Sequence, residues 1–243
     1  MKLELIVFCA ITIIGSRAAN LPSYIQPCSR SLPADQLTEC VTKQARSIQS
    51  EFAKGIPQFD LEPLDPLALD EISAKAGTFN IKSKNLILKG LKKMEVKEVR
   101  WNFEKNSGSM KLFGNMTFQG DYETDGRLLL IPFQGNGKIT VKTLDTDILI
   151  KYKIRKVTGS DGVEHIETYD LKQSQTYGRV WFHLTNLLGG ASLGDTINQV
   201  MNDNWRDLIK ELGPPYTKAV ANKVHEIINK LYKNVPFDEL FAP

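Results

Sequence analysis

Apolar and polar residues alternate along this chain with two different periods, and the changes of period divide it into three stretches. In residues 33–54, apolar side chains such as Leu37 and Val41 recur every three or four positions, which predicts one amphipathic helix. Gly55 and the prolines that follow it, up to Pro66, end this pattern and favour an extended connector over a central strand.

Residues 79–188 show the two-residue period of β-strands. One run places Val99, Trp101 and Phe103 on a single face, and similar runs follow it. Turn residues separate the runs, at positions 106–108, 124–126, 135–137 and 159–162. The pattern predicts an antiparallel meander with one apolar and one solvated face, in which the Gly-Asn-Gly sequence at 135–137 forms a hairpin turn.

The helical period returns between Leu193 and Leu231. A Gly-Pro-Pro sequence at 213–215 interrupts it, which predicts either two helices or one long helix kinked at that point. The part from Asp195 to Leu212 alone would be about 27 Å long at 1.5 Å per residue. A helix of that length can run through the concavity of a curved sheet.

The N-terminal segment has the features of a secretory signal peptide. Its apolar run, residues 5–14, is shorter than the roughly 20 residues that a membrane span needs, and small residues precede the expected cleavage after Ala18 or Ala19. The alternative is an N-terminal anchor. Cleavage would remove residues 1–18 and leave 19–243 as a single secreted domain, in which no later segment has the length of a transmembrane helix.

The composition is that of a globular protein. The 243 residues are 42% hydrophobic and carry a formal net charge of only +3, which argues against disorder and against nucleic acid as the main partner. The most basic run, residues 82–97, alternates with apolar residues and contains Glu95, so a solvated strand face explains it better than nucleic acid binding. A transient contact with an anionic membrane is the alternative hypothesis for this run.

Cysteine usage predicts one disulfide bond. Of the three cysteines, Cys9 lies in the expected signal peptide, so Cys28 and Cys40 remain as a pair in an oxidising compartment. A metal site would need clustered ligands, whereas the histidines occur singly, so we expect neither a metal nor a cofactor. These histidines are His165, His183 and His225.

Asn115-Met116-Thr117 is the one N-glycosylation sequon after residue 18. Within its strand, Asn115 has the parity that faces solvent, where a glycan has to lie. We therefore expect Asn115 to be a glycosylation site.

Several segments occur in an order that identifies a family. They are Cys28 and Cys40 before the first helix, PLDPL at 63–67, GNG at 135–137, FHLTNLLGG at 182–190, NQVMNDNW at 198–205 and VPFDELF at 235–241. The set covers nearly all of residues 19–243 and resembles the insect takeout and juvenile hormone-binding protein family.

This resemblance implies an α+β fold in which a highly curved antiparallel sheet wraps around a long C-terminal helix. Lipid-transfer proteins of the bactericidal/permeability-increasing type share that architecture, which encloses an apolar tunnel. The resemblance also implies a secreted, monomeric carrier of a small lipophilic ligand, such as a juvenile hormone-like terpenoid or a fatty acid. Members of the family are linked to circadian, feeding and chemosensory regulation. Juvenile hormone-binding proteins of moths have a second disulfide, and this chain has no cysteine after Cys40, so it is more similar to the takeout-like branch.

Large apolar and aromatic side chains are the candidates for the tunnel wall, with ordinary core packing as the alternative for each. They are Trp101, Phe103, Phe118, Tyr122, Phe133, Tyr152, Trp181, Val200, Met201 and Trp205. The hydroxyl groups of Tyr122 and Tyr152 are candidates for orienting an ester, epoxide or carbonyl group of the ligand.

Two other functions are compatible with parts of the sequence. A protein- or membrane-interaction module with the same fold would have its cavity filled by side chains. A serine hydrolase is formally suggested by Gly190-Ala191-Ser192-Leu193-Gly194, but no strand follows that could carry the acid and the histidine of a triad. We therefore predict no catalytic residues, and assign this glycine-rich segment to a turn between strand and helix.

Overall fold

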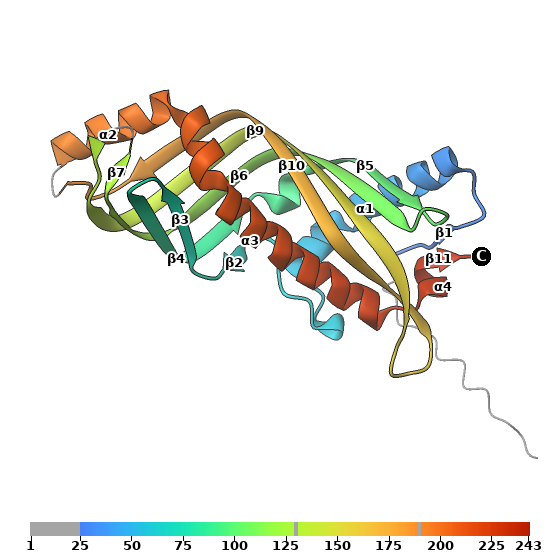
Figure 1. Cartoon of the computed structure of the whole chain (residues 1–243). Coiled ribbons are helices and arrows are strands. Elements are labelled where there is room, and N and C mark those ends of the chain that lie inside the picture. The colour runs from blue at the N-terminus through green and yellow to red at the C-terminus, as the bar shows by residue number, and fades with distance from the viewer. Residues whose placement is uncertain (1–24, 129–130, 189–190) are drawn as a thin grey trace, which may run out of the picture.

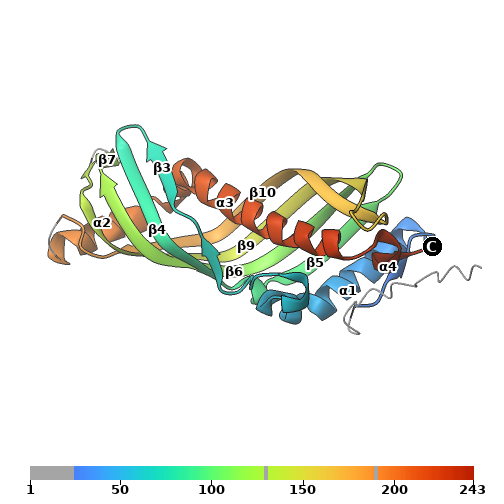
Figure 2. The ribbon, with the colours of Figure 1, turned by 90° about the horizontal axis from the view of Figure 1, so that it is seen from below.

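The computed structural model describes residues 25–128, 131–188 and 191–243, so the expected signal peptide lies outside the described residues. The molecule is an elongated α+β fold in which one long helix lies along the concave side of an antiparallel sheet (Figures 1 and 2). The described helices are α1 (Ala34–Lys54), α2 (Ala191–Asp203), α3 (Trp205–Asn234) and α4 (Phe237–Leu240), with short 3₁₀ turns at Pro57–Phe59 and Leu91–Lys93.

Seven of the described strands form the main sheet. They are β2 (Leu67–Leu69), β3 (Ile72–Ala76), β4 (Phe79–Lys89), β5 (Glu95–Asn102), β6 (Ser107–Asp125), β9 (Gly135–Thr158) and β10 (Glu164–Leu184). The three long strands lie in the order β10, β9, β6. The far edge of β6 is shared by β5 and β4, and β4 in turn pairs with β2 and β3. The remaining pairs are β1 (Cys28–Ser29) with β11 (Phe241–Ala242) and β7 (Arg127–Leu128) with β8 (Ile131–Pro132).

The sheet is strongly curved, as the family resemblance implies. Its ladders shift register between Gly114 and Met116 on β6, and between Tyr169 and Lys172 on β10. Such bulges bend a strand and increase its twist. The two bulges lie within the long strands, so the sheet bends along its length and presents a concave face to α3 (Figure 2).

The prediction of a hairpin turn at Gly135-Asn136-Gly137 is wrong. These residues are the first three of β9 and pair with β6, for example Gly137 with Tyr122. Glycine is needed here because a Cβ on Gly137 would lie 2.6 Å from the carbonyl oxygen of Thr185, and one on Gly135 would lie 2.7 Å from that of Asn186. The two glycines allow the segment after β10 to lie close beside the start of β9, where Thr185 donates a backbone hydrogen bond to Lys138 and Leu187 forms a bridge with Gly135.

The helical break is at Asn204 and not at the Gly-Pro-Pro sequence, so the predicted uninterrupted helix from Asp195 to Leu212 is also wrong. The backbone of Asn204 leaves the helical region, with φ −105° and ψ 23°, and its side-chain Nδ2 donates a 2.8 Å hydrogen bond to the carbonyl of Val200. This bond caps the end of α2 and favours a new helix after Asn204.

Helix α3 continues through Pro214 and Pro215 and is about 45 Å long at 1.5 Å per residue. The prolines remove the N–H groups that would bond to the carbonyls of Lys210 and Glu211. Both of these residues are exposed, so water can satisfy their carbonyls. The sequence alone could not show this, because the cost of the prolines depends on which side of the helix faces solvent.

Three asparagines bind the free edge of β10 with the same pair of hydrogen bonds. The backbone N–H of Leu184 donates to Asn198 Oδ1, and Asn198 Nδ2 donates to the carbonyl of Leu184, both at 2.9 Å. The same pairs join Asn202 to Phe182 and Asn229 to Thr168, with distances of 2.7–3.0 Å. We call Asn198, Asn202 and Asn229 the asparagine clasp. It fastens α2 and α3 to the sheet without extending the β-ladder.

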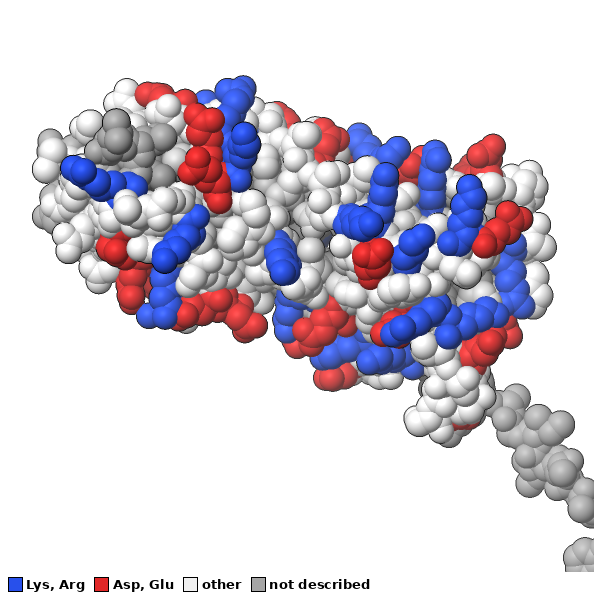
Figure 3. All heavy atoms as spheres, in the orientation of Figure 1, with Lys and Arg blue, Asp and Glu red and all other residues white. Residues whose placement is uncertain are grey.

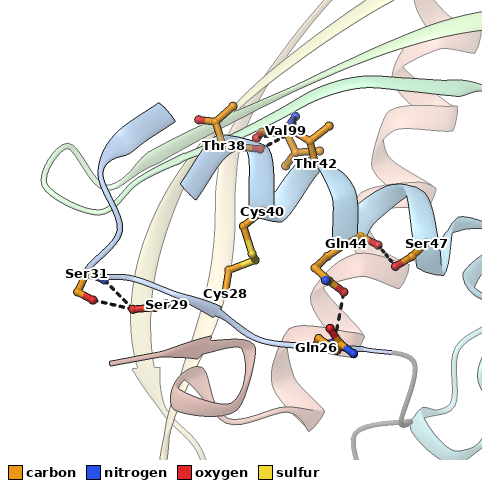
Figure 4. The surroundings of a disulfide bond; sticks show 10 residues. All are labelled: Gln26, Cys28, Ser29, Ser31, Thr38, Cys40, Thr42, Gln44, Ser47 and Val99. Carbon is orange, nitrogen blue, oxygen red and sulfur yellow. Dashed lines mark hydrogen bonds between the residues drawn. A yellow bond between two sulfur atoms is a disulfide. The ribbon is translucent and has the colours of Figure 1, made fainter. Parts of the chain in front are cut away.

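The predicted disulfide between Cys28 and Cys40 is confirmed, and Figure 4 shows it joining β1 to α1. The two Cα atoms are 6.0 Å apart, and Cys28 is buried in a second hydrophobic cluster with Leu37 and Val41 of α1. The same cluster contains Trp101, Phe237 and Phe241, and β1 pairs with β11, so the disulfide lies where both ends of the described chain pack at one end of the sheet.

Replacing both cysteines by serine should lower the free energy of unfolding by about 3 kcal/mol, because a loop of this size restricts the unfolded chain by roughly that amount. Urea unfolding followed by circular dichroism measures the change. Wild-type protein in reducing agent is the control and should match the variant. Unchanged unfolding of the wild type on reduction would contradict the prediction.

Candidate ligand-binding site

The space between α3 and the concave face of the sheet is a cavity with a volume of about 180 Å³. Helix α3 packs against β10 on one side and β3 on the other, so it closes the groove that the curved sheet leaves open (Figures 1 and 2). Side chains from β4, β6, β9 and β10 form the floor, and α3 forms the roof with residues such as Leu212, Val220, Ala221 and Val224.

Most of the lining is aliphatic or aromatic. Among the described residues that line the cavity, none is Lys, Arg, Asp or Glu. The strand periodicity explains this composition, because within stretches of β6 and β9 alternate residues point inward and most of them are apolar, as with Met110 and Leu112 or Ile148 and Ile150. An apolar cavity with a few polar groups is the usual form of a site for a hydrophobic small molecule.

Three of the residues expected in the tunnel wall line this cavity: Phe118, Tyr152 and Met201. Burial raises the pKa of the Tyr152 hydroxyl well above its usual value. The ring of Trp101 lies 5.7 Å from that of Tyr152 and 5.9 Å from that of Tyr232, between centroids. Trp101 therefore lies behind two lining tyrosines rather than in the wall itself.

The other candidates lie outside the described lining. Phe103 belongs to the cluster at the α1 end, where its ring centroid is 5.0 Å from that of Phe241. Phe133 is buried against Phe79, with ring centroids 5.4 Å apart. Val200 is partly exposed on α2.

Trp205 is buried in the main core at the start of α3, with the guanidinium of Arg206 4.5 Å from its ring centroid. Trp181 is on the outer face of β10, 38% exposed, and stacks on His183. Trp181 and Phe182 are consecutive on the strand, so their side chains point to opposite faces of the sheet, and that of Phe182 lines the cavity.

Tyr122 also differs from the expectation that its hydroxyl faces the tunnel. The hydroxyl donates a 2.6 Å hydrogen bond to the carbonyl of Thr185, and the residue does not belong to the described lining. Burial raises the pKa of Tyr122 to about 12, so the phenol stays protonated and keeps this bond at neutral pH. This bond holds the segment after β10 beside the start of β9.

Polar residues of the lining were missed by the sequence analysis. His225 Nε2 lies 2.8 Å from the carbonyl of Thr168 and 3.0 Å from Asn229 Nδ2, so this histidine belongs to a bonded group between α3 and β10. Gln173, Gln175 and Tyr177 of β10 also line the cavity. The signal in the sequence was three polar residues at alternate positions of one strand. The strand has a bulge between Tyr169 and Lys172, and the sequence does not show which alternate residues face inward after it.

The outer surface carries charges of both signs, with Lys and Arg more frequent over the half that holds β5 and the β9–β10 hairpin (Figure 3). Several lysines of the basic run form ion pairs with carboxylates, namely Lys82–Glu71 at 2.8 Å, Lys84–Glu123 at 2.9 Å and Lys97–Glu95 at 2.6 Å. Asn115 is exposed on β6, and its Oδ1 accepts a hydrogen bond from the backbone N–H of Asp145.

Two parts of the hydrolase motif, Gly190 and the side chain of Ser192, lie outside the described residues. The two histidines nearest to this motif in the sequence lie in different places. His183 stacks on Trp181 on the outer face of β10, whereas His225 lines the cavity. Within the ranges that the structure covers, no helix combines the length and apolar character needed to cross a membrane.

A curved antiparallel sheet closed by a long helix over an apolar cavity defines a class of proteins that carry hydrophobic molecules. The chain belongs to the haemolymph juvenile hormone binding protein family, whose model matches residues 5–242. This family is named for ligand binding and not for catalysis.

Individual relatives agree with this assignment. The circadian clock-controlled protein daywake of Drosophila melanogaster is 26% identical over 215 residues, which covers 83% of each chain. A juvenile hormone-binding protein of Manduca sexta is 22% identical over 147 residues, or 58% of this chain and 60% of the relative. The crystal structure of Takeout 1 from Epiphyas postvittana superposes with a TM-score of 0.81 at 26% identity, covering 90% of this chain and all of that one. These findings confirm the predicted takeout-like family and the predicted fold.

Proposed function

We propose that this protein is secreted after removal of residues 1–18 and carries one small hydrophobic molecule in its cavity. The ligand is a juvenile hormone-like terpenoid, a fatty acid or another lipid, and the carrier acts in circadian, feeding or chemosensory regulation. The observation that supports this function best is the uncharged, largely apolar lining between α3 and the sheet. The relative named for circadian clock control supports the proposed regulatory role. The relative named for juvenile hormone binding supports the proposed hydrophobic ligand.

The disulfide supports the secretory route, because such bonds persist in oxidising compartments. Asn115, exposed on the outer face, is the proposed glycosylation site of the secreted form. We propose a monomeric carrier, with contact to a membrane or receptor only while ligand is loaded or released. An interaction module with a filled cavity is the alternative, and the open space under α3 favours the carrier.

Native mass spectrometry of the protein secreted from insect cells tests the proposal, followed by organic extraction. We expect one lipid to leave with the protein, and a fluorescent apolar probe such as N-phenyl-1-naphthylamine to bind saturably once that lipid is removed. Secretion is read from the N-terminus of the product, which should be residue 19 or 20. A protein that carries no lipid and binds no probe would contradict the carrier function.

A further inference from the structure

Three polar side chains of β10 form a hydrogen-bonded row inside the largely apolar cavity. Gln173, Gln175 and Tyr177 occupy alternate positions, so all three project from the same face of the strand, and all three line the cavity. Gln173 Nε2 donates to Gln175 Oε1 at 2.8 Å, and Gln175 Nε2 donates to the hydroxyl oxygen of Tyr177. We call these three residues the polar ladder.

Both bonds of the polar ladder run in the same direction, which leaves a donor at its Tyr177 end. The Tyr177 oxygen accepts from Gln175, so its hydrogen is available to a further acceptor. Within the described residues, the bond from Gln175 is the only hydrogen bond of this hydroxyl. Burial raises the pKa of Tyr177 to about 12, so the group is a neutral donor at physiological pH. Hydrogen bonds in series also strengthen one another.

Within the described lining, no Lys, Arg, Asp or Glu lies around the polar ladder. In the pairing of β10 with β9, Gln173 lies opposite Ile150, Gln175 opposite Ile148 and Tyr177 opposite Thr146. The Thr146 hydroxyl donates a 3.1 Å hydrogen bond to Thr143 Oγ1, and among the described residues no hydrogen bond joins it to Tyr177. The roof contributes Val220, Ala221 and Val224 of α3. The only basic side chain in the described lining, His225, has its Nε2 within hydrogen-bonding distance of Thr168 and Asn229.

These surroundings discriminate between kinds of lipid. A hydrocarbon would leave the Tyr177 hydrogen without an acceptor when it displaces water from the cavity, which is unfavourable. A fatty acid anion would enter an apolar space in which no Lys or Arg among the described lining residues can neutralise it. A neutral lipid with a carbonyl oxygen meets neither penalty.

We propose that Tyr177, held by Gln175 and Gln173, is a ligand-binding residue that donates a hydrogen bond to the ester or ketone oxygen of a neutral lipid. This inference rests on the proposed carrier function and narrows its ligand: the protein prefers neutral carbonyl lipids to hydrocarbons and to fatty acid anions. The polar ladder is thus a specificity site in the middle of β10.

Competition against bound N-phenyl-1-naphthylamine at pH 7.5 tests this preference with three ligands of similar chain length: methyl palmitate, palmitate and octadecane. The wild type should be half-displaced by methyl palmitate at a concentration roughly three- to tenfold lower than by either competitor, the worth of one buried hydrogen bond. Tyr177→Phe should lose this difference. Tyr169→Phe is the matched control, because Tyr169 is on the same strand but is 40% exposed and lies outside the described lining, so the preference should remain.

The outcomes separate this proposal from the proposed function. Saturable probe binding without preference for the ester, or with preference for palmitate, leaves the carrier function intact and shows that the specificity site is wrong. An ester preference that persists in Tyr177→Phe also leaves the carrier function intact and shows that the specificity site is wrong. If Tyr177→Phe does not unfold cooperatively, Gln175→Leu replaces it and should reduce the preference by removing the bond that orients the hydroxyl. A wild type that binds no probe contradicts both proposals.

Discussion

Replacing Ala221 by tryptophan should weaken binding of an apolar probe by roughly a hundredfold, which corresponds to about 2.8 kcal/mol. Ala221 lies in the roof of the cavity, on the face of α3 turned to the sheet. An indole group at this position would occupy much of a space of about 180 Å³. Because backbone hydrogen bonds join the floor strands, they cannot move apart to restore the volume. Fluorescence titration with N-phenyl-1-naphthylamine measures the effect.

Asn222→Trp is the control for this substitution. Asn222 is the next residue of α3 and is exposed, so the same side chain is added to the same helix outside the cavity. The control should bind the probe with wild-type affinity, and both variants should unfold cooperatively. Equal binding by Ala221→Trp and the wild type would show that the probe binds elsewhere, and would contradict the assignment of this cavity as the ligand site.

Replacing Asn198 by leucine should lower the free energy of unfolding by roughly 4 kcal/mol. The leucine fills a similar volume, but it leaves the backbone N–H and C=O of Leu184 without the two bonds that Asn198 supplies. Leu184 is 2% exposed, so water cannot replace them. Each buried group left unpaired costs about 1–3 kcal/mol. Chemical denaturation monitored by tryptophan fluorescence measures the loss.

Gln199→Leu provides the comparison on the same helix. Gln199 is exposed and adjacent to Asn198, so its replacement tests the effect of a leucine on α2 without removing bonds to β10. We expect a change within about 0.5 kcal/mol, as for other surface substitutions. If Asn198→Leu were equally mild, the clasp would contribute little to stability.

Much of the fold follows from local patterns that are independent of tertiary context. The amphipathic period predicted α1, and the alternation of Val99, Trp101 and Phe103 predicted β5 and the residue after it. The position of the break between α2 and α3 could not be predicted in this way. Pro214 is tolerated because the affected carbonyls face water, and Asn204 ends α2 through a side-chain bond that composition does not specify.

The sequence predicted the kind of site better than its residues. The family resemblance implied an apolar tunnel, and the strand alternation proposed Phe118 and Tyr152 for its wall; both side chains line the cavity. Trp181 lies on the outer face because the inward parity of β10 changes between Tyr177 and Phe182, both of which line the cavity. The alternation of residues along the sequence does not show such a change. The bulge earlier in β10 conceals the polar ladder, whose residues look like those of a solvated face until their register is known.

The asparagine clasp has a consequence for how copies of this protein meet. An edge strand with unpaired N–H and C=O groups is a template on which another chain can add a strand. On β10, side chains from α2 and α3 occupy these groups at Thr168, Phe182 and Leu184. A side-chain amide pairs with the N–H and C=O groups of the strand but supplies no backbone with which a further strand could pair. The clasp therefore terminates the sheet at both ends of this edge and protects the protein against aggregation through strand addition there.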